Sequence, residues 1–282
     1  NNLKNNNLLS PYLIWPTVRE ASKQEIKLVH TQDYIDLVEK EVNLLQKNSI
    51  SYLSTGDTVI SKESNKVART AVGAGLSGAD AIMKGEVSSA FVLSRPPGHH
   101  ASASKGMGFC IYNNIAIVAR YLQKKYDIKR ILIVDFDVHH GNGTQEIFYN
   151  DESVLYGSIH QHPLFPGTGM ESEKGVGNIF NAPIDSGTTS EDFLKIFNEK
   201  ILKNVDKFKP EVILISAGFD AHKRDPLAAI NLDSEDYFLL TQAIVEIADR
   251  HSNGRVISFL EGGYDLLALS ESIEAHFKGL SL

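Results

Sequence analysis

The chain contains a single cysteine in 282 residues, Cys110. One cysteine excludes an intrachain disulfide, and without a cysteine cluster there is no cysteine-bound structural zinc. An unpaired cysteine is usually a small buried residue, so we expect Cys110 to pack in the core. No apolar run approaches the ~18 residues that a membrane helix needs, and no membrane partner is expected. The sequence also has no Gly-x-Ser-x-Gly or P-loop signature.

Basic charge is also scarce. There are 28 Lys and Arg residues against 35 Asp and Glu residues, which gives a formal net charge of −7. This balance argues against direct binding to nucleic acid, where a basic surface supplies most of the affinity. A cationic partner is better tolerated, and self-association into an oligomer stays open.

The N-terminus lacks both an initiator methionine and an apolar signal core, since it reads Asn-Asn-Leu-Lys-Asn-Asn-Asn. This start predicts a trimmed, intracellular chain, and we expect a cytoplasmic location. No Pro/Gly/Ser-rich linker or charge block divides the sequence, so residues 1–282 are predicted to form a single domain.

The apolar pattern predicts an α/β fold with a central, mostly parallel sheet. Near-continuous apolar runs, typical of parallel strands covered on both faces, lie at Ser89–Ser94, Arg130–Asp135, Ser153–Ile159, Val212–Ser216 and Val256–Leu260. Helical patterns between them span Ile111–Tyr126, Ser190–Phe208 and Asp233–Arg250. Strands that alternate with helices favour three layers, with the sheet in the middle.

Unusual polar and aromatic residues follow these strands. They are His99 and His100 after the first strand, Asp137 and His139 after the second, Phe165 after the third, Asp220 after the fourth and Tyr264 after the fifth. In open α/β sheets, ligands bind at the carboxyl ends of the strands. We therefore expect these distant segments to meet at one edge of the sheet.

Asp137, His139 and Asp220 are predicted to bind a divalent metal. Asp135, Asp137 and His139 alternate along one strand, so their side chains project from one face. Two carboxylates and one imidazole leave coordination positions for water and substrate, as in catalytic zinc sites. The same donors also suit Fe(II) or Co(II). The alternative without a metal is that Asp137 and His139 form a purely structural polar pair whose hydrogen bonds are satisfied by caps at the strand end.

Three further features point to a reaction site at this edge. The adjacent imidazoles of His99 and His100 suit proton transfer near neutral pH. Tyr264 follows two glycines and offers a phenolic donor for an oxygen that gains negative charge. Phe109 and Phe165 would wall an apolar entrance. Each of these residues has a purely structural alternative, namely core packing or a satisfied buried histidine.

Two other motif matches are discounted. Residues 73–78 read Gly-Ala-Gly-Leu-Ser-Gly, but no strand precedes them, so we expect close helix packing there and no dinucleotide site. Asn142-Gly143-Thr144 matches a glycosylation acceptor, but it lies inside the predicted metal motif of a chain expected to be intracellular.

Together these motifs resemble the zinc-dependent histone deacetylase superfamily, closest to its class II and bacterial deacetylase-like branch. The matching segments are Arg-Pro-Pro-Gly-His-His-Ala at 95–101, Gly-Phe-Cys-Ile-Tyr-Asn-Asn at 108–114, Asp-Phe-Asp-Val-His-His-Gly-Asn-Gly-Thr at 135–144, Phe-Pro-Gly-Thr-Gly at 165–169, Ser-Ala-Gly-Phe-Asp-Ala-His at 216–222 and Glu-Gly-Gly-Tyr at 261–264. The resemblance implies one arginase–deacetylase type domain and hydrolysis of the acyl amide of acetyl-lysine in proteins or peptides.

The resemblance also implies roles for individual residues. Asp137, His139 and Asp220 match the zinc ligands, and Tyr264 matches the tyrosine that stabilises the oxyanion. His99 and His100 match the catalytic histidine pair. Asp135 would orient His99, and Asn142 would orient His100 as in class II members, without adding charge.

The resemblance further implies a structural potassium ion and a substrate channel. The potassium residues would be Asp135, Asp137, His139, Ser158 and Ile159, largely through backbone carbonyls. Gly108, Phe109 and Phe165 would contact the acyl-lysine stem. Leu227 stands where polyamine-selective members carry an acidic residue, and so favours acyl-lysine in a protein or peptide. Asp57 weakly matches the aspartate that holds the substrate backbone.

One departure from the family pattern concerns the start of the chain, because no segment rich in His, Pro, Glu and Arg precedes Leu8. We therefore expect the family's N-terminal segment to be missing. Three alternatives to a lysine deacylase stay open. They are an amidohydrolase for acetylated polyamines or other small amides, a non-catalytic module that binds acetyl-lysine, and an arginase-type dinuclear site, which Asn142 disfavours.

Overall fold

A six-stranded, all-parallel sheet forms the centre of the structure, a computed structural model that describes residues 13–281. In spatial order its strands are β3 (Ser89–Val92), β8 (Val256–Leu260), β7 (Val212–Ala217), β4 (Ile131–Asp135), β5 (Val154–Gln161) and β6 (Ile179–Ile184). The predicted α/β fold is confirmed. The segment before Leu8, where the family's opening residues were expected to be missing, lies outside the described residues.

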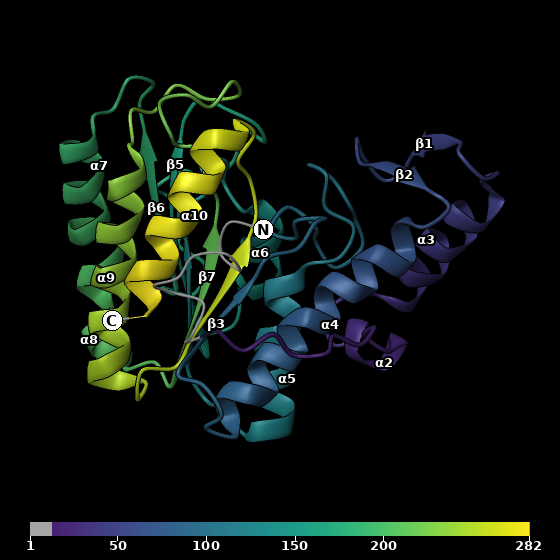
Figure 1. Cartoon of the computed structure of the whole chain (residues 1–282), viewed down its shortest axis with the longest axis horizontal. Helices are drawn as coiled ribbons and strands as arrows, with labels where there is room; N and C mark the ends of the chain where they lie inside the picture. The colour runs from purple at the N-terminus through teal and green to yellow at the C-terminus, as the bar shows by residue number, and fades with distance from the viewer. Residues whose placement is uncertain (1–12, 282) are drawn as a thin grey trace.

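Helices cover both faces of the sheet and make three layers (Figure 1). One face carries α4 (Ser64–Met83), α5 (Asn114–Tyr126) and α6 (Asn142–Phe148), with α2 (Lys23–Ile26) packed outside α5 and α3 (Gln32–Leu44) outside α4. The other face carries α7 (Ser190–Ile196), α8 (Val205–Phe208), α9 (Ser234–His251) and α10 (Leu266–Leu280). Strand residues alternate between the two apolar cores: Ile131 and Ile133 join the first, Leu132 and Val134 the second.

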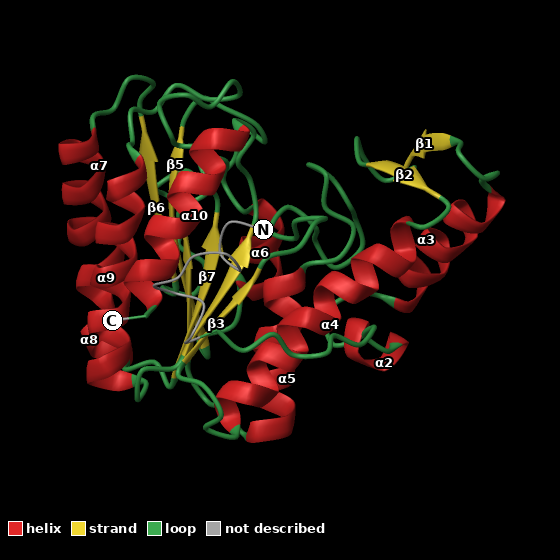
Figure 2. Cartoon of the chain, in the orientation of Figure 1, coloured by secondary structure: helices red, strands yellow, loops and turns green. Residues whose placement is uncertain are grey.

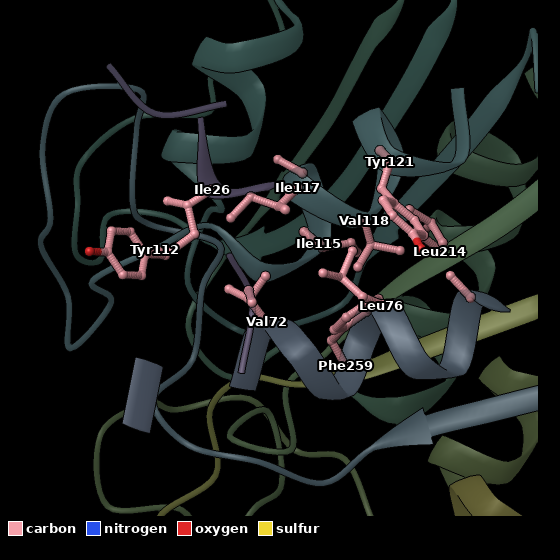
Figure 3. Close-up of a cluster of buried hydrophobic side chains, with 14 of the residues drawn as sticks. Ile26, Val72, Leu76, Tyr112, Ile115, Ile117, Val118, Tyr121, Leu214 and Phe259 are labelled. Carbon is pink, nitrogen blue, oxygen red and sulfur yellow. The ribbon is translucent and has the colours of Figure 1, made fainter. Parts of the chain in front are cut away.

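The glycines of the discounted Gly-x-Gly-x-x-Gly motif lie inside α4, as expected. A Cβ atom on Gly73 would lie 1.7 Å from the carbonyl oxygen of Arg19, and one on Gly75 would lie 2.6 Å from the ring of Phe259. Figure 3 shows Phe259 of β8 beside Leu76 of α4 in the apolar core between the helix and the sheet. Close packing of α4 against its neighbours therefore explains the motif. Cys110 is fully buried, as predicted.

The sequence reading missed β6 and the small antiparallel hairpin of β1 (Ile50–Tyr52) and β2 (Val59–Ser61), which Figure 2 shows apart from the main sheet. β6 contains Asn181 and Pro183 and so lacks an apolar run. Among the described residues it is an edge strand that pairs only with β5, so a proline without an N–H group is tolerated there.

Predicted element ends shift by a few residues. The five predicted strands are all present, with ends that move by at most two residues. The helix expected from Ile111 begins at Asn114, where the Asn113 side chain caps it by accepting from the backbone N–H of Ala116. The segment Ser190–Phe208 is helical throughout but passes through a π turn and a 3₁₀ turn after Ile196.

Candidate active site

Asp137, His139 and Asp220 meet at the carboxyl ends of the neighbouring strands β4 and β7. Their candidate ligand atoms all lie within 4.8 Å of one another. Nδ1 of His139 is 3.1 Å from Oδ1 of Asp137 and 3.1 Å from Oδ2 of Asp220. All three side chains are buried. The structure thus brings together the three residues that the sequence placed on two separate segments. We call these three side chains the metal cluster.

Backbone donors and two glycines hold the carboxylates in place. Gly262 donates its N–H to Oδ2 of Asp137 over 2.7 Å, and Val138 donates to Oδ1 of Asp220 over 3.0 Å. A Cβ atom on Gly218 would lie 2.1 Å from Oδ2 of Asp137, and one on Gly262 would lie 2.0 Å from Oδ2 of Asp220. Only glycine fits at these two positions.

The electrostatics of the cluster favour a cation. Burial opposes protonation of His139, but hydrogen bonds and charges from Asp137 and Asp220 outweigh it and raise its pKa to about 11. Burial and the charge of Asp137 raise the pKa of Asp220 to about 6. Two buried carboxylates with one imidazole need compensating positive charge, so this donor set fits a divalent metal ion.

His99 and His100 lie beside the cluster, and each ring has a different partner. Nδ1 of His99 is 3.1 Å from Oδ2 of Asp135, and Nδ1 of His100 is 2.8 Å from Oδ1 of Asn142. Because an amide oxygen only accepts, His100 donates its Nδ1–H, and its Nε2 is left with a free lone pair. The ring centroids of the two histidines are 4.0 Å apart.

Opposite pKa shifts distinguish the two rings. For His99, burial lowers the pKa, but the charges of Asp135, Asp137 and Glu261 outweigh it and raise the value to about 10. For His100, burial and the neighbouring charge of His99 hold the pKa well below its usual value. The surroundings therefore favour the cationic form of His99 and the neutral form of His100.

Tyr264 is held at the cavity by its backbone and its ring. Its N–H donates to Oδ2 of Asp225 over 2.7 Å, and the guanidinium of Arg95 lies over its ring, 5.5 Å from the centroid. Burial and the charges of Asp137 and Asp220 raise the pKa of its phenol. The hydroxyl is therefore protonated and able to donate at neutral pH.

A cavity leads from the surface to these groups. It is lined by Asp57, Pro97, His99, His100, Gly108, Phe109, Asp137, His139, Leu164, Phe165, Leu227, Gly262 and Tyr264. Phe109, Phe165 and Leu227 are about half exposed and form an apolar mouth. Asp57 lies at the same mouth, where its Oδ1 accepts the N–H of Gly108 over 2.8 Å.

Comparison with known proteins decides the family. The histone deacetylase domain profile matches residues 1–280. "Histone deacetylase 10, chloroplastic" of Oryza sativa subsp. japonica is 38% identical over 268 residues, which cover 92% of this chain and 60% of that protein. A "Probable deacetylase" of Archaeoglobus fulgidus is 41% identical over 251 residues, 88% of this chain and 68% of that one. The chain belongs to the histone deacetylase family.

A solved structure agrees with this assignment. The crystal structure of the HDA15 HD domain superposes with a TM-score of 0.87 at 39% identity, covering 94% of this chain and 74% of that one. Zinc dependence is general in the family.

The chain spans about three fifths of the length of the rice relative. No helix within residues 13–281 is long and apolar enough to cross a membrane, and the cytoplasmic location stays a prediction.

The residues expected to hold potassium include two members of the metal cluster, Asp137 and His139, together with residues of β4 and β5. Asp135 of β4 pairs in register with Ser158 of β5, and Ile159 follows. All three are fully buried. The hydroxyl of Ser158 is 2.9 Å from Nδ1 of His160. The potassium ion itself stays a prediction.

The sequence reading assigned no role to several residues that support the site. The hydroxyl of Tyr156 donates to Oδ2 of Asp135 over 3.0 Å, and a tyrosine inside an apolar strand gives no sign of this. Asp225 anchors Tyr264, and Leu164 lines the cavity. Glu261 accepts the backbone N–H of Gly98, the residue before His99. Only Glu261 carried a signal, because it begins the Glu-Gly-Gly-Tyr motif.

Proposed function

We propose that this chain is a metal-dependent lysine deacylase that hydrolyses the acyl amide of acetyl-lysine in proteins or peptides. The observation that carries the proposal is a cavity with apolar walls that ends on the metal cluster, a neutral histidine and a tyrosine hydroxyl. A binding module without turnover has no use for a free imidazole lone pair beside a metal cluster.

Asp137, His139 and Asp220 would hold the metal, which we propose is zinc, with Fe(II) or Co(II) as substitutes. A divalent ion held there would supply Lewis-acid chemistry, polarising the acyl carbonyl and lowering the pKa of a water. Asp135, Asp137, His139, Ser158 and Ile159 would hold a structural potassium ion.

The proton path uses the histidine pair. His100 accepts the proton of the attacking water at Nε2, the atom that its bond to Asn142 leaves free. His99 is oriented by Asp135, and the neighbouring carboxylates favour its protonated form. The tyrosine hydroxyl of Tyr264 donates to the acyl oxygen as negative charge develops on it. His100 then returns its proton to the departing amine.

The walls of the cavity suit an acyl-lysine side chain. Phe109 and Phe165 would bury the methylene stem, with Gly108 beside them, because apolar walls hold a hydrocarbon chain without a polar partner. A Cβ atom on Gly108 would lie 2.3 Å from Cδ2 of His100, so this wall needs glycine. Asp57 at the mouth would accept a backbone N–H of a peptide substrate.

Leu227 favours an acyl-lysine substrate over an acetylated polyamine. Its half-exposed side chain offers no charge for the second ammonium of a polyamine. The zinc-loaded protein should therefore show a kcat/KM for acetyl-lysine peptide at least about tenfold above that for acetylputrescine, the size of effect that one pocket contact supplies.

The matched control is Leu227→Glu, which places an acid at the mouth. It should narrow or invert the preference while acetyl-lysine turnover continues. A higher kcat/KM of the wild-type protein for acetylputrescine than for acetyl-lysine peptide would instead support the amidohydrolase for small amides. Metal-loaded protein that turns over neither these substrates nor longer acyl-lysine peptides would favour the non-catalytic reading.

A further inference from the structure

Glu261 is a fully buried carboxylate that does not line the cavity. It follows β8 directly, and its own N–H donates to the carbonyl of Ala217 at the end of β7. A buried carboxylate is costly unless donors satisfy it. Its surroundings therefore show what it is for.

Three donors reach this carboxylate. Oε2 accepts the backbone N–H of Gly98 over 2.7 Å and that of His99 over 3.2 Å, and Oε1 accepts the hydroxyl of Ser216 over 3.0 Å. The segment that carries the histidine pair is irregular, so these two amides have no strand or helix partner. Without Glu261 they would be buried and unpaired.

The carboxylate clamps the histidine segment from one side. On the other side the carbonyl of His99 accepts the N–H of Thr144, at the start of α6. The imidazole contacts with Asp135 and Asn142 fix the rings, while Glu261 and Thr144 fix the main chain that carries them. A shift of this main chain would move Nε2 of His100 relative to the cavity.

We propose that Glu261 is a positioning residue that holds the His99–His100 backbone in register with the metal cluster, and that it acts through its reach as a hydrogen-bond acceptor. The role rests on the proposed deacylase function for its kinetic consequence. Burial raises the pKa of Glu261 to about 7, which agrees with a group whose negative charge is not essential.

Two substitutions separate reach from charge. Glu261→Gln keeps the length and an acceptor for the two amides, and its NH₂ can donate to Ser216. Glu261→Asp keeps the charge but withdraws the acceptor by about 1.5 Å, one C–C bond. We expect Glu261→Gln to retain kcat within about threefold. Glu261→Asp should lose about 30- to 100-fold in kcat with KM nearly unchanged, the cost of a displacement near 1 Å.

Hydrogen exchange at the amides of Gly98 and His99 provides a readout that does not depend on activity. Both amides should stay protected in Glu261→Gln and exchange at least about tenfold faster in Glu261→Asp, with equal zinc content in both proteins. Faster exchange in Glu261→Asp with an inactive wild-type protein would refute the deacylase and leave the positioning role standing.

The reverse ranking, with Glu261→Asp active and Glu261→Gln inactive, would overturn the proposal in favour of a charge effect. Equal kcat and equal protection in all three proteins would also overturn it. Should Glu261→Asp not fold, Glu261→Gln alone decides: unprotected amides or a loss of kcat beyond tenfold in the folded variant would overturn the assignment.

Discussion

At the scale of single residues, adjacent histidines acquire different chemistry from their neighbours. His99 faces Asp135 and stays charged, whereas His100 faces the neutral amide of Asn142 and stays uncharged. An acid in place of Asn142 would favour the protonated form of His100 and so remove the lone pair that the proposed general base needs. The side-chain amide therefore suits a base at this position.

The hydroxyl of Tyr264 is the residue-scale feature with the largest expected effect. Tyr264→Phe keeps the ring that Arg95 covers but removes the donor, and should lower kcat on an acetyl-lysine peptide by about 10²- to 10³-fold. Steady-state kinetics measure this, with zinc content and thermal unfolding as controls. Turnover at the wild-type rate would remove Tyr264 from the reaction.

The candidate residues were predictable because each has a chemical type and a place at a strand end. Asp137, His139 and Asp220 could be picked out because they are metal-binding residue types that follow predicted strands, and the structure places them together. Tyr156 and Asp225 were not predictable in this way. Their contacts with Asp135 and Tyr264 depend on distances between elements, which a sequence does not contain.

At the scale of elements, the loop after β5 carries one wall of the cavity and is tied down by a directed chain of hydrogen bonds. Gln145 donates to the carboxylate of Glu173, so its amide oxygen faces Nε2 of His140 and accepts from it. Nδ1 of His140 must then accept, and the hydroxyl of Thr168 donates to it over 2.7 Å. Phe165 lies three residues before this anchor.

Removal of the anchor should loosen the wall. Thr168→Val leaves Nδ1 of His140 without its donor. It should raise KM for acetyl-lysine peptide about fivefold, the equivalent of one hydrogen bond of ~1 kcal/mol, with kcat within about twofold. Thr168→Ser keeps the hydroxyl and should behave as wild type. An unchanged KM in Thr168→Val would show that the wall does not depend on this bond.

Elements were predictable where burial imposed a pattern. The strands buried on both faces read as apolar runs, whereas β6 at the edge, with Asn181 and Pro183, did not. Helix starts depend on single caps such as Asn113, which lie inside a longer apolar periodicity. This is why the ends of elements moved while the elements themselves were found.

At the scale of the whole molecule, buried neutral histidines couple stability to pH. His276 joins α10 to α9 and β8, since its Nδ1 lies 2.5 Å from the hydroxyl of Thr241 and its Nε2 lies 2.8 Å from that of Ser258. Burial lowers the pKa of His276 to about 3. The unfolded chain, with a histidine pKa of ~6.5, then binds one more proton between these values.

The stability that neutral His276 contributes is therefore complete above pH ~6.5 and is lost as the pH falls toward 3. Compared with His276→Gln, which cannot titrate, the wild-type advantage in free energy of unfolding should shrink by ~1.4 kcal/mol per pH unit in this window. Urea unfolding of both proteins at pH 7.5, 6 and 5 measures the difference. A pH-independent difference would show that His276 titrates normally in the folded protein.

The position of the site on the molecule was predictable from chain order alone, because the carboxyl ends of parallel strands share one edge. The core-facing strands β4, β7 and β8 are neighbours in the sheet, and the segments after them carry both the metal cluster and Tyr264. Chain order predicts this shared edge but not which strands are neighbours along it, since β7 lies between β8 and β4 through crossover connections.

The burial of Cys110 makes the chain silent toward thiol-directed dyes. Its side chain is fully enclosed, and burial raises the pKa of its thiol well above the usual value, so neither access nor thiolate is available for labelling. A cysteine placed at the half-exposed Leu227 would then be the single reactive thiol of this chain. A fluorophore there would report directly on a substrate entering the mouth of the cavity.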